Sequence, residues 1–448
     1  MTTTRTLAEF IADTDFTNLP SPVVEAAKIA ILDGVANMVA GSVQELADII
    51  GRYVRDAGGS PQASVIGWGY RTNPPAAAFA NGVFGHCLDY EIQGFPPTHG
   101  TSSCLPSALA LAEQHHIPGN RVITAYALGW EIQGRLRAAS APATRPGYHP
   151  PGLVGPLGGA AASAKTLDLD AEQTLMALGI AASRTGGLTA NTGTMVKSTH
   201  PGNAARMGAE AGILAGMGYT ASDEALESPV GFAAALFGGE FDWDVATGGL
   251  GASWRLVDPG FDIKRFPAQV YMQNAIEAAL NLREQNGLDP ADIEQVTIHR
   301  RGRGHSGPTP RSGLDGKFSV EYCAAAALLD GHVGIDTFTD ARRFSPDMED
   351  MLGRIGVEPE GPESGATLAT AVLKDGRTVS AECSAFSGSA SNPMSRDQRL
   401  AKVRDCFRRA LSEADTERVL DMLENLERLD DVSQLMEVLG KTALCPSA

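Results

Sequence analysis

Acid–base side chains are concentrated in residues 86–100, HCLDYEIQGFPPTHG. Asp89 and Glu91 lie two residues apart there, and His99 follows a Pro-Pro-Thr run that holds the backbone extended. Histidine titrates near neutral pH and a carboxylate can hold its tautomer, so these residue types suit general acid–base catalysis. A solvated loop whose histidine caps the next helix explains the same pattern, and the residues alone leave both interpretations open.

A second polar stretch, TRPGYHPPGLVG, contains Arg145, Tyr148 and His149. The flanking prolines restrict the backbone around the histidine, which is one way to position a base before a reaction begins. A structural turn would account for the same prolines.

A third stretch, TMVKSTHPGNAARMG, spaces Lys197, His200, Asn203 and Arg206 three residues apart, and the glycine before Asn203 predicts a helix start there. Cations beside the free N–H groups of a helix N-terminus favour a carboxylate-binding cradle, with a solvated helix start as the alternative. A fourth stretch, FDIKRFPAQVYMQNAIEA, contains Lys264 close to a predicted domain junction, where ligand pockets commonly form.

Helical segments must position these residues. Residues 21–41, SPVVEAAKIAILDGVANMVAG, begin with Ser-Pro and end with Gly, which predicts a helix, and their apolar residues occupy nearly every face, which predicts burial. Similar Ala- and Gly-rich stretches continue to about residue 265, with almost no convincing strand.

The pattern changes after residue 266. The stretch ADIEQVTIHRRG alternates like a strand, and ATLATAVLKDGRTVSAECSA predicts a hairpin that turns at Asp375-Gly376. A helical pattern returns at residue 400. The sequence therefore predicts a mainly α protein with a large all-helical bundle domain formed by residues 1–266 and 400–448, and an inserted smaller α+β domain formed by residues 267–399.

Composition excludes some partners. The 448 residues carry a formal net charge of −17, which argues against nucleic acid because phosphate binding needs a clustered basic face. Without a signal-peptide pattern or an apolar run of ~20 residues, we expect a cytoplasmic protein with no membrane partner. The chain lacks a dinucleotide-binding fingerprint in context, a P-loop and an H-E-x-x-H motif, so we expect no cofactor and no metal.

Six of these segments resemble the MmgE/PrpD family and appear in family order across essentially the whole chain: THG…LPSALALAE, YHPPGLVGPLGGAAASAK, VKSTHPGNAARMGAEAG, IKRFPA, KFSVEY and NPMS. The resemblance implies the same two-domain fold, an active site between the domains, a small polycarboxylate substrate and a homodimer. The family's catalytic aspartate, histidines, lysines and tyrosine fall on Asp89, His99, His149, Lys197, Lys264 and Tyr322. Arg145, Tyr148, His200 and Gln93 are the expected substrate-binding residues.

The loop after Asp89 departs from the family pattern. It reads YEIQG, with Gln93 where dehydratase and decarboxylase members usually carry a threonine. In length and in this altered loop the sequence looks like iminodisuccinate epimerase, a cofactor-independent member. The sequence therefore predicts an epimerase that removes and returns a proton at a carbon alpha to a carboxylate. The alternatives are a dehydratase or lyase on a 2-methylcitrate-like or aconitate-like polycarboxylate, and a helical scaffold without activity.

Overall fold

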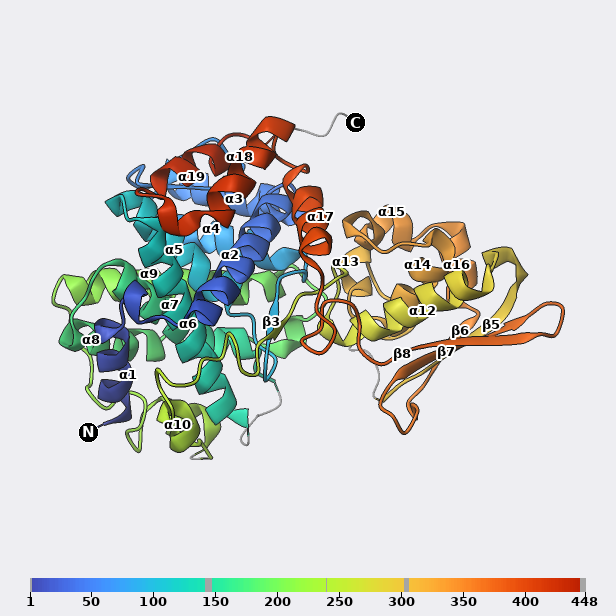
Figure 1. Ribbon diagram of the computed structural model, residues 1–448, viewed down its shortest axis with the longest axis horizontal. Helices are drawn as coiled ribbons and strands as arrows, with labels where there is room; N and C mark the ends of the chain where they lie inside the picture. The colour runs from blue at the N-terminus through green and yellow to red at the C-terminus, as the bar shows by residue number, and fades with distance from the viewer. Residues whose placement is uncertain (1, 142–146, 239, 302–305, 444–448) are drawn as a thin grey trace.

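Helices dominate the structure, a computed structural model that describes residues 2–141, 147–238, 240–301 and 306–443 (Figure 1). The prediction of a mainly α protein is confirmed. The helices of the first part are α1 (Thr3–Asp13), α2 (Ser21–Gly41), α3 (Glu45–Ala57), α4 (Pro74–Cys87), α5 (Thr101–His115), α6 (Gly119–Ala139), α7 (Pro150–Thr166), α8 (Ala171–Ala182), α9 (Val196–Gly216), α10 (Phe232–Phe237) and α11 (Trp243–Thr247).

Small residues let the central helices α4, α5, α7 and α9 approach closely. A Cβ atom at Gly82 of α4 would lie 2.9 Å from the Cα atom of Gly202 in α9, so the two backbones are in contact there. The predicted helix start before Asn203 is wrong, because α9 begins at Val196 and runs through Pro201. The glycine at 202 serves this close packing and does not begin the helix.

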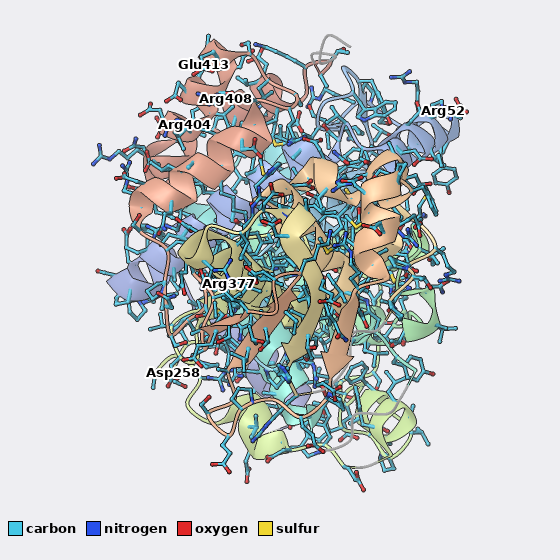
Figure 2. The ribbon with its side chains drawn as sticks, turned by 90° about the vertical axis from the view of Figure 1, so that its right-hand side faces the viewer. Arg52, Asp258, Arg377, Arg404, Arg408 and Glu413 are labelled. Carbon is cyan, nitrogen blue, oxygen red and sulfur yellow. The ribbon has the colours of Figure 1, made fainter. Side chains whose placement is uncertain are left out.

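The C-terminal helices return to the bundle. They are α17 (Arg396–Phe407), α18 (Glu413–Glu424) and α19 (Ser433–Leu439), and α17 and α18 both pack against α2 (Figure 1). Arg404, Arg408 and Glu413 mark the outer surface of this layer in Figure 2. Most of the buried apolar residues of the first 263 positions and of these three helices form one continuous core.

A second core lies between residues 266 and 386. Its four-stranded sheet has the order β6 (Ile355–Glu358), β5 (Ile293–His299), β7 (Thr367–Leu373) and β8 (Thr378–Cys383), with β5 and β6 parallel and the other pairs antiparallel. The hairpin predicted at Asp375-Gly376 is confirmed, and Gly376 adopts the positive φ of 85° that favours glycine. The helices of this part are α12 (Gln273–Asn286), α13 (Gly313–Gly316), α14 (Val320–Asp330), α15 (Asp340–Arg343) and α16 (Pro346–Leu352).

These two cores support the domain division predicted at residues 266 and 400, which stays a proposal. Short strand pairs are added to the helical part, which the sequence had not indicated: β1 (Ala63–Ser64) with β2 (Arg71–Thr72), and β3 (Gln93–Gly94) with β4 (Phe261–Asp262). Within the described residues no helix is both long and apolar enough to cross a membrane.

Candidate active site

A buried carboxylate held between two lysines forms the centre of the candidate site. Lys197 Nζ donates to Asp89 Oδ2 at 2.7 Å, and Lys264 Nζ donates to Asp89 Oδ1 and, at 3.0 Å, to the Asp89 carbonyl oxygen. Lys264 is fully buried and Asp89 is 2% exposed. Burial alone would raise the pKa of Asp89, but the two ammonium groups hold that pKa well below its ordinary value.

Three separate segments bring these charges together. Asp89 follows α4 with a φ of 50°, a left-handed conformation that aspartate tolerates better than most residues. The antiparallel pairing of β3 with β4 places residues 93–94 beside 261–262, so that Lys264 reaches back to the loop after α4. The close contact of α4 and α9 at Gly82 and Gly202 brings Lys197, in the first turn of α9, to the same point.

His86 and Glu91 extend the network behind Lys197. His86 Nδ1 lies 2.5 Å from Glu91 Oε1, and its Nε2 lies 2.8 Å from Lys197 Nζ. A carboxylate accepts and an ammonium donates, so the arrangement assigns the proton to Nδ1 and leaves Nε2 as the acceptor. Glu91 also accepts from the backbone N–H and the hydroxyl of Ser102 in the first turn of α5.

One ring nitrogen of His99 makes no hydrogen bond with the described residues. Its Nδ1 lies 3.1 Å from Glu91 Oε1, but the two are not aligned for a hydrogen bond, and this buried nitrogen has no hydrogen-bond partner in the described structure. The ring centroid is 4.4 Å from that of His86. A buried polar atom without a partner usually marks a functional position, so His99 is the ring best placed to exchange a proton with a ligand.

His149 approaches the same centre from another direction. It precedes α7 as its N-cap, and its backbone N–H donates to the Gly187 carbonyl oxygen at 3.0 Å. Its Nδ1 lies 3.0 Å from His200 Nδ1, so one of these two nitrogens carries the shared proton. Gly187 has a φ of 130°, and a Cβ there would lie 3.0 Å from the His200 ring, so a side chain would disturb the pair.

The electrostatic field of the cluster favours neutral imidazoles. Burial first, and the Lys197 ammonium second, lower the pKa of His86 and His149 well below the ordinary value of 6.5. Burial and the Lys264 ammonium do the same to His99. These rings are therefore neutral near pH 7, and the negative charges of a bound polycarboxylate would raise their pKa values.

The histidines also define the described group best placed for a metal ion. Ring nitrogens of His86, His99 and His149 lie within 4.8 Å of one another. The Lys197 ammonium already occupies the His86 Nε2 position at 2.8 Å and would repel a second cation. The predicted absence of a metal and of a cofactor stays a prediction.

Three predicted residues have other positions than expected. The Tyr322 hydroxyl donates to the Thr337 carbonyl oxygen at 2.5 Å inside the second core, and among the described residues no hydrogen bond joins it to the cluster. The Gln93 amide donates to the Thr98 carbonyl oxygen at 2.7 Å and so fixes the loop before His99. Tyr148 is 37% exposed. The predicted Arg145 lies outside the described residues.

Sequence reasoning missed several inward-facing groups. His86 lies in the last turn of the apolar helix α4, and only its position three residues before Asp89 could have indicated it. Lys317 Nζ donates to the carbonyl oxygens of Leu88 and Pro267, and burial lowers its pKa to about 8. Arg137 lines a small cavity with Tyr148, donates to the Pro97 carbonyl oxygen at 3.3 Å, and has no carboxylate within ion-pair distance among the described residues.

The chain thus combines a helical bundle, a smaller α+β part and a buried cluster of lysine, aspartate and histidine side chains. The MmgE/PrpD N-terminal domain model matches residues 5–244 and the C-terminal domain model matches residues 266–428, so the chain belongs to the MmgE/PrpD family. The human relative named cis-aconitate decarboxylase is 31% identical over 442 residues, which cover 94% of this chain and 91% of that protein. The cis-aconitate decarboxylase of Aspergillus terreus is 28% identical over 96% of this chain and 93% of its own length.

Proposed function

We propose that this protein is a lyase that acts on an aconitate-like polycarboxylate and releases carbon dioxide. The observation that carries the proposal is the buried pair Lys197 and Lys264 on one carboxylate, beside a histidine without a hydrogen-bond partner. The named relatives, which are decarboxylases, favour this reaction over the epimerisation that the altered loop after Asp89 predicts. Neither named relative is an epimerase or is named for iminodisuccinate.

Charge stabilisation is the task of the two lysines. When the carbon–carbon bond to the departing carboxylate breaks, its electron pair stays on the substrate and spreads into the remaining unsaturated carboxylate. Fixed ammonium groups stabilise that growing negative charge without having to reorganise, most strongly where water is excluded. Asp89 accepts hydrogen bonds from both lysines and so holds them in place, and we therefore assign it a positioning role.

Proton delivery is the task of His99. The carbanion left by carbon dioxide must take one proton at carbon, and the neutral His99 ring can bring that proton only if it first takes one from solvent as the anionic substrate raises its pKa. The reaction then balances, because one carboxylate and one proton become one carbon–hydrogen bond and carbon dioxide. His149 is the second ring near the centre, with His200 fixing its orientation.

An epimerase is the second candidate, and one observation favours it. The rings of His99 and His149 come from different segments and their centroids are 6.1 Å apart, which suits removal of a proton on one face of a carbon and its return on the other. This chemistry would use the same lysines to stabilise an enediolate. The reactions differ in whether a bond to carbon dioxide breaks.

Proton NMR in D2O separates the candidates. The full-length protein is offered cis-aconitate, 2-methylcitrate and single stereoisomers of iminodisuccinate in separate tubes. The proposal expects new vinylidene resonances and released carbon dioxide from cis-aconitate, with deuterium at the protonated carbon. Deuterium exchange with appearance of other stereoisomers of iminodisuccinate, and no change in cis-aconitate, would replace the lyase by the epimerase.

Variants of the histidines link the activity to the cluster. We expect His99→Gln to lower kcat by about 100-fold or more, the usual contribution of a general acid or base. His115→Gln removes an exposed histidine at the far end of α5 and is the matched control, with kcat unchanged. Full activity in His99→Gln would remove this ring from proton transfer.

A further inference from the structure

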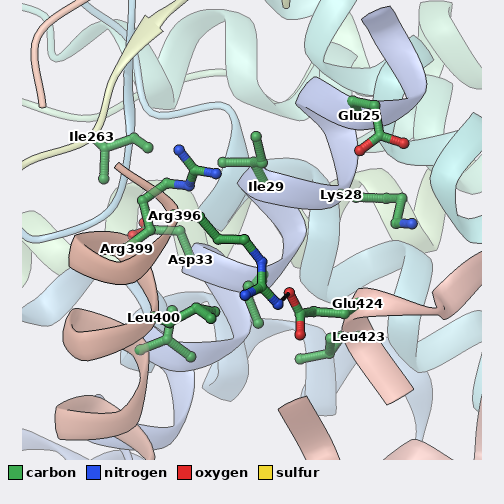
Figure 3. A pocket seen from close by; sticks show the side chains of 12 residues that line it. Glu25, Lys28, Ile29, Asp33, Ile263, Arg396, Arg399, Leu400, Leu423 and Glu424 are labelled. Atoms are coloured by element: carbon green, nitrogen blue, oxygen red, sulfur yellow. Dashed lines mark hydrogen bonds and ion pairs between the residues drawn. The ribbon is translucent and has the colours of Figure 1, made fainter. Parts of the chain in front are cut away.

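A cavity lies between the N-terminal helix α2 and the C-terminal helices α17 and α18. Its volume is about 160 Å³ (Figure 3). The walls are half apolar and half charged. The apolar side chains include Ile29, Leu400 and Leu423, with Ile263 from the segment that precedes Lys264. None of the residues that line it belongs to the Asp89 cluster, which consists of His86, Asp89, Glu91, His99, His149, Lys197, His200 and Lys264. The cavity is therefore separate from the candidate active site.

One charged group in this cavity lacks a counter-ion. The Arg399 guanidinium is partly buried and donates to the Met394 carbonyl oxygen at 2.8 Å, but no carboxylate among the described residues lies within ion-pair distance of it. The neighbouring cations are already paired, since Arg396 bonds to Glu424 and Lys28 lies 2.8 Å from Glu427. Burial and the charge of Arg396 lower the pKa of Arg399. The negative charge of an anion bound to Arg399 would offset this lowering of the pKa.

The opposite side of the cavity restricts what kind of anion can bind. Glu25 and Lys28 stand at the other side from Ile263 and Arg399 (Figure 3), and the buried Asp33 forms part of the lining. The carboxylates of Glu25 and Asp33 would repel a ligand with several negative charges. One guanidinium facing an apolar wall suits one carboxylate attached to a hydrocarbon chain.

The size of the space sets the length of that chain. A dry cavity of about 150 Å³ is known to hold benzene, a molecule of six carbons. A space of about 160 Å³ therefore accommodates a hydrocarbon part of roughly that size. We propose that this cavity is a second binding site, which holds a short-chain monocarboxylate with its carboxylate on Arg399 and its hydrocarbon chain against Ile29, Leu400 and Leu423.

The floor of the cavity connects it to the frame of the active site. Lys402 Nζ lies 2.6 Å from Asp33 Oδ1 and donates to the carbonyl oxygens of Tyr90 at 2.8 Å and Lys264 at 3.0 Å. Tyr90 follows Asp89 directly in the chain. Asp33 lines the cavity, and its partner Lys402 bonds the backbone on both sides of the Asp89–Lys264 pair, so a chain of direct contacts joins the second site to the first.

The test uses sodium pentanoate and isothermal titration calorimetry on the full-length protein, which needs no turnover. We expect saturable binding to the unaltered chain, no binding of pentan-1-ol, which has the same chain length without the charge, and an affinity for pentanoate at least about tenfold weaker in Arg399→Gln. Arg408→Gln is the matched control, because Arg408 follows the end of the same helix and pairs with Glu413 on the surface (Figure 2). This variant should bind pentanoate with unchanged affinity.

A second variant protects the test against a folding defect in Arg399→Gln. Ile29→Trp fills the cavity from α2 and leaves the guanidinium in place, so it should also abolish binding. Absence of pentanoate binding to the unaltered chain overturns the proposal. Equal affinity in Arg399→Gln would also overturn it, because pentanoate would then be occupying another site such as the Asp89 cluster. Neither result depends on which reaction the protein catalyses.

Discussion

Asp89→Asn tests whether the buried charge balance of the site holds Lys197 and Lys264. The substitution keeps the shape of the side chain, and asparagine tolerates the left-handed backbone at this position, where φ is 50°. It replaces one carboxylate oxygen by an amide NH2 group. That group must face one of the two ammonium groups, so a donor then meets a donor in a site where Lys264 is fully buried.

The size of the effect follows from the burial of all three groups. Removing one partner of a buried ion pair typically costs about 3–5 kcal/mol, because the remaining charge is left uncompensated. Lys264 keeps a bond to the Asp89 carbonyl oxygen and Lys197 keeps one to His86, which limits the loss. We therefore expect a loss of about 4 kcal/mol in the free energy of unfolding and a fall of about 100-fold or more in kcat.

Urea unfolding measures the first quantity and steady-state release of carbon dioxide measures the second. Glu113→Gln is the control: Glu113 is a buried carboxylate near the other end of α5, bonded to Ser64, and its loss should reduce stability without reducing kcat. Removing the uncompensated cation as well, in Asp89→Asn/Lys264→Met, should recover part of the stability. If Asp89→Asn is as stable and as active as the unaltered protein, the charge argument for this site is wrong.

Two further predictions concern the histidines and Lys402. In the folded chain the pKa values of His86, His99 and His149 lie below the ordinary value of 6.5. As pH falls through 6.5, the unfolded chain therefore binds protons that the folded chain does not bind. The free energy of unfolding should fall by about 1.4 kcal/mol per pH unit for each ring until the pKa of the folded state is reached. Burial and the charge of Lys197 also lower the pKa of His200, so four rings contribute. Urea unfolding at a series of pH values should therefore show this slope reduced by about a quarter in His99→Gln; an unchanged slope would contradict the neutral state of that ring. Lys402→Met strands the buried Asp33 and should cost about 3–5 kcal/mol. Thermal unfolding should show most of that stability restored in Asp33→Asn/Lys402→Met. The value of kcat should stay low in both variants, because the carbonyl oxygens of Tyr90 and Lys264 have lost their donor. A normal kcat would show that these bonds do not position the site.

Local patterns were sufficient to predict much of the fold. The helix expected over residues 21–41 has those bounds, and the Asp-Gly pair turns the hairpin between β7 and β8. Both signals depend on residues close together in the chain. The β3–β4 pair escaped notice because each strand has two residues and the two are separated by more than 160 positions, so neither leaves a periodic pattern.

Part of the candidate site could also be predicted from local sequence patterns. Asp89, His99, Lys197 and Lys264 are polar residues in otherwise apolar surroundings, and this contrast is visible in a sequence. Tyr322 has the residue type that the family resemblance implies, yet its hydroxyl is bonded inside the second core. His86 is hidden in the apolar sequence of α4, and its role depends on contacts with Glu91 and Lys197 that only the folded chain creates.

The bonds around His86 link Lys197 to Glu91, although the His86 side chain is buried. Lys197 donates hydrogen bonds to Asp89 and to His86. His86 in turn donates to Glu91, which accepts a hydrogen bond from the backbone N–H of Ser102 in the first turn of α5. The position of the Lys197 ammonium is thus set by two acceptors from the α4 end and its loop. The same Glu91 oxygen lies 3.1 Å from His99 Nδ1 without an aligned hydrogen bond. One carboxylate thus fixes the ring that bonds Lys197 and leaves His99 Nδ1 unbonded, as the proposed proton transfer by His99 requires.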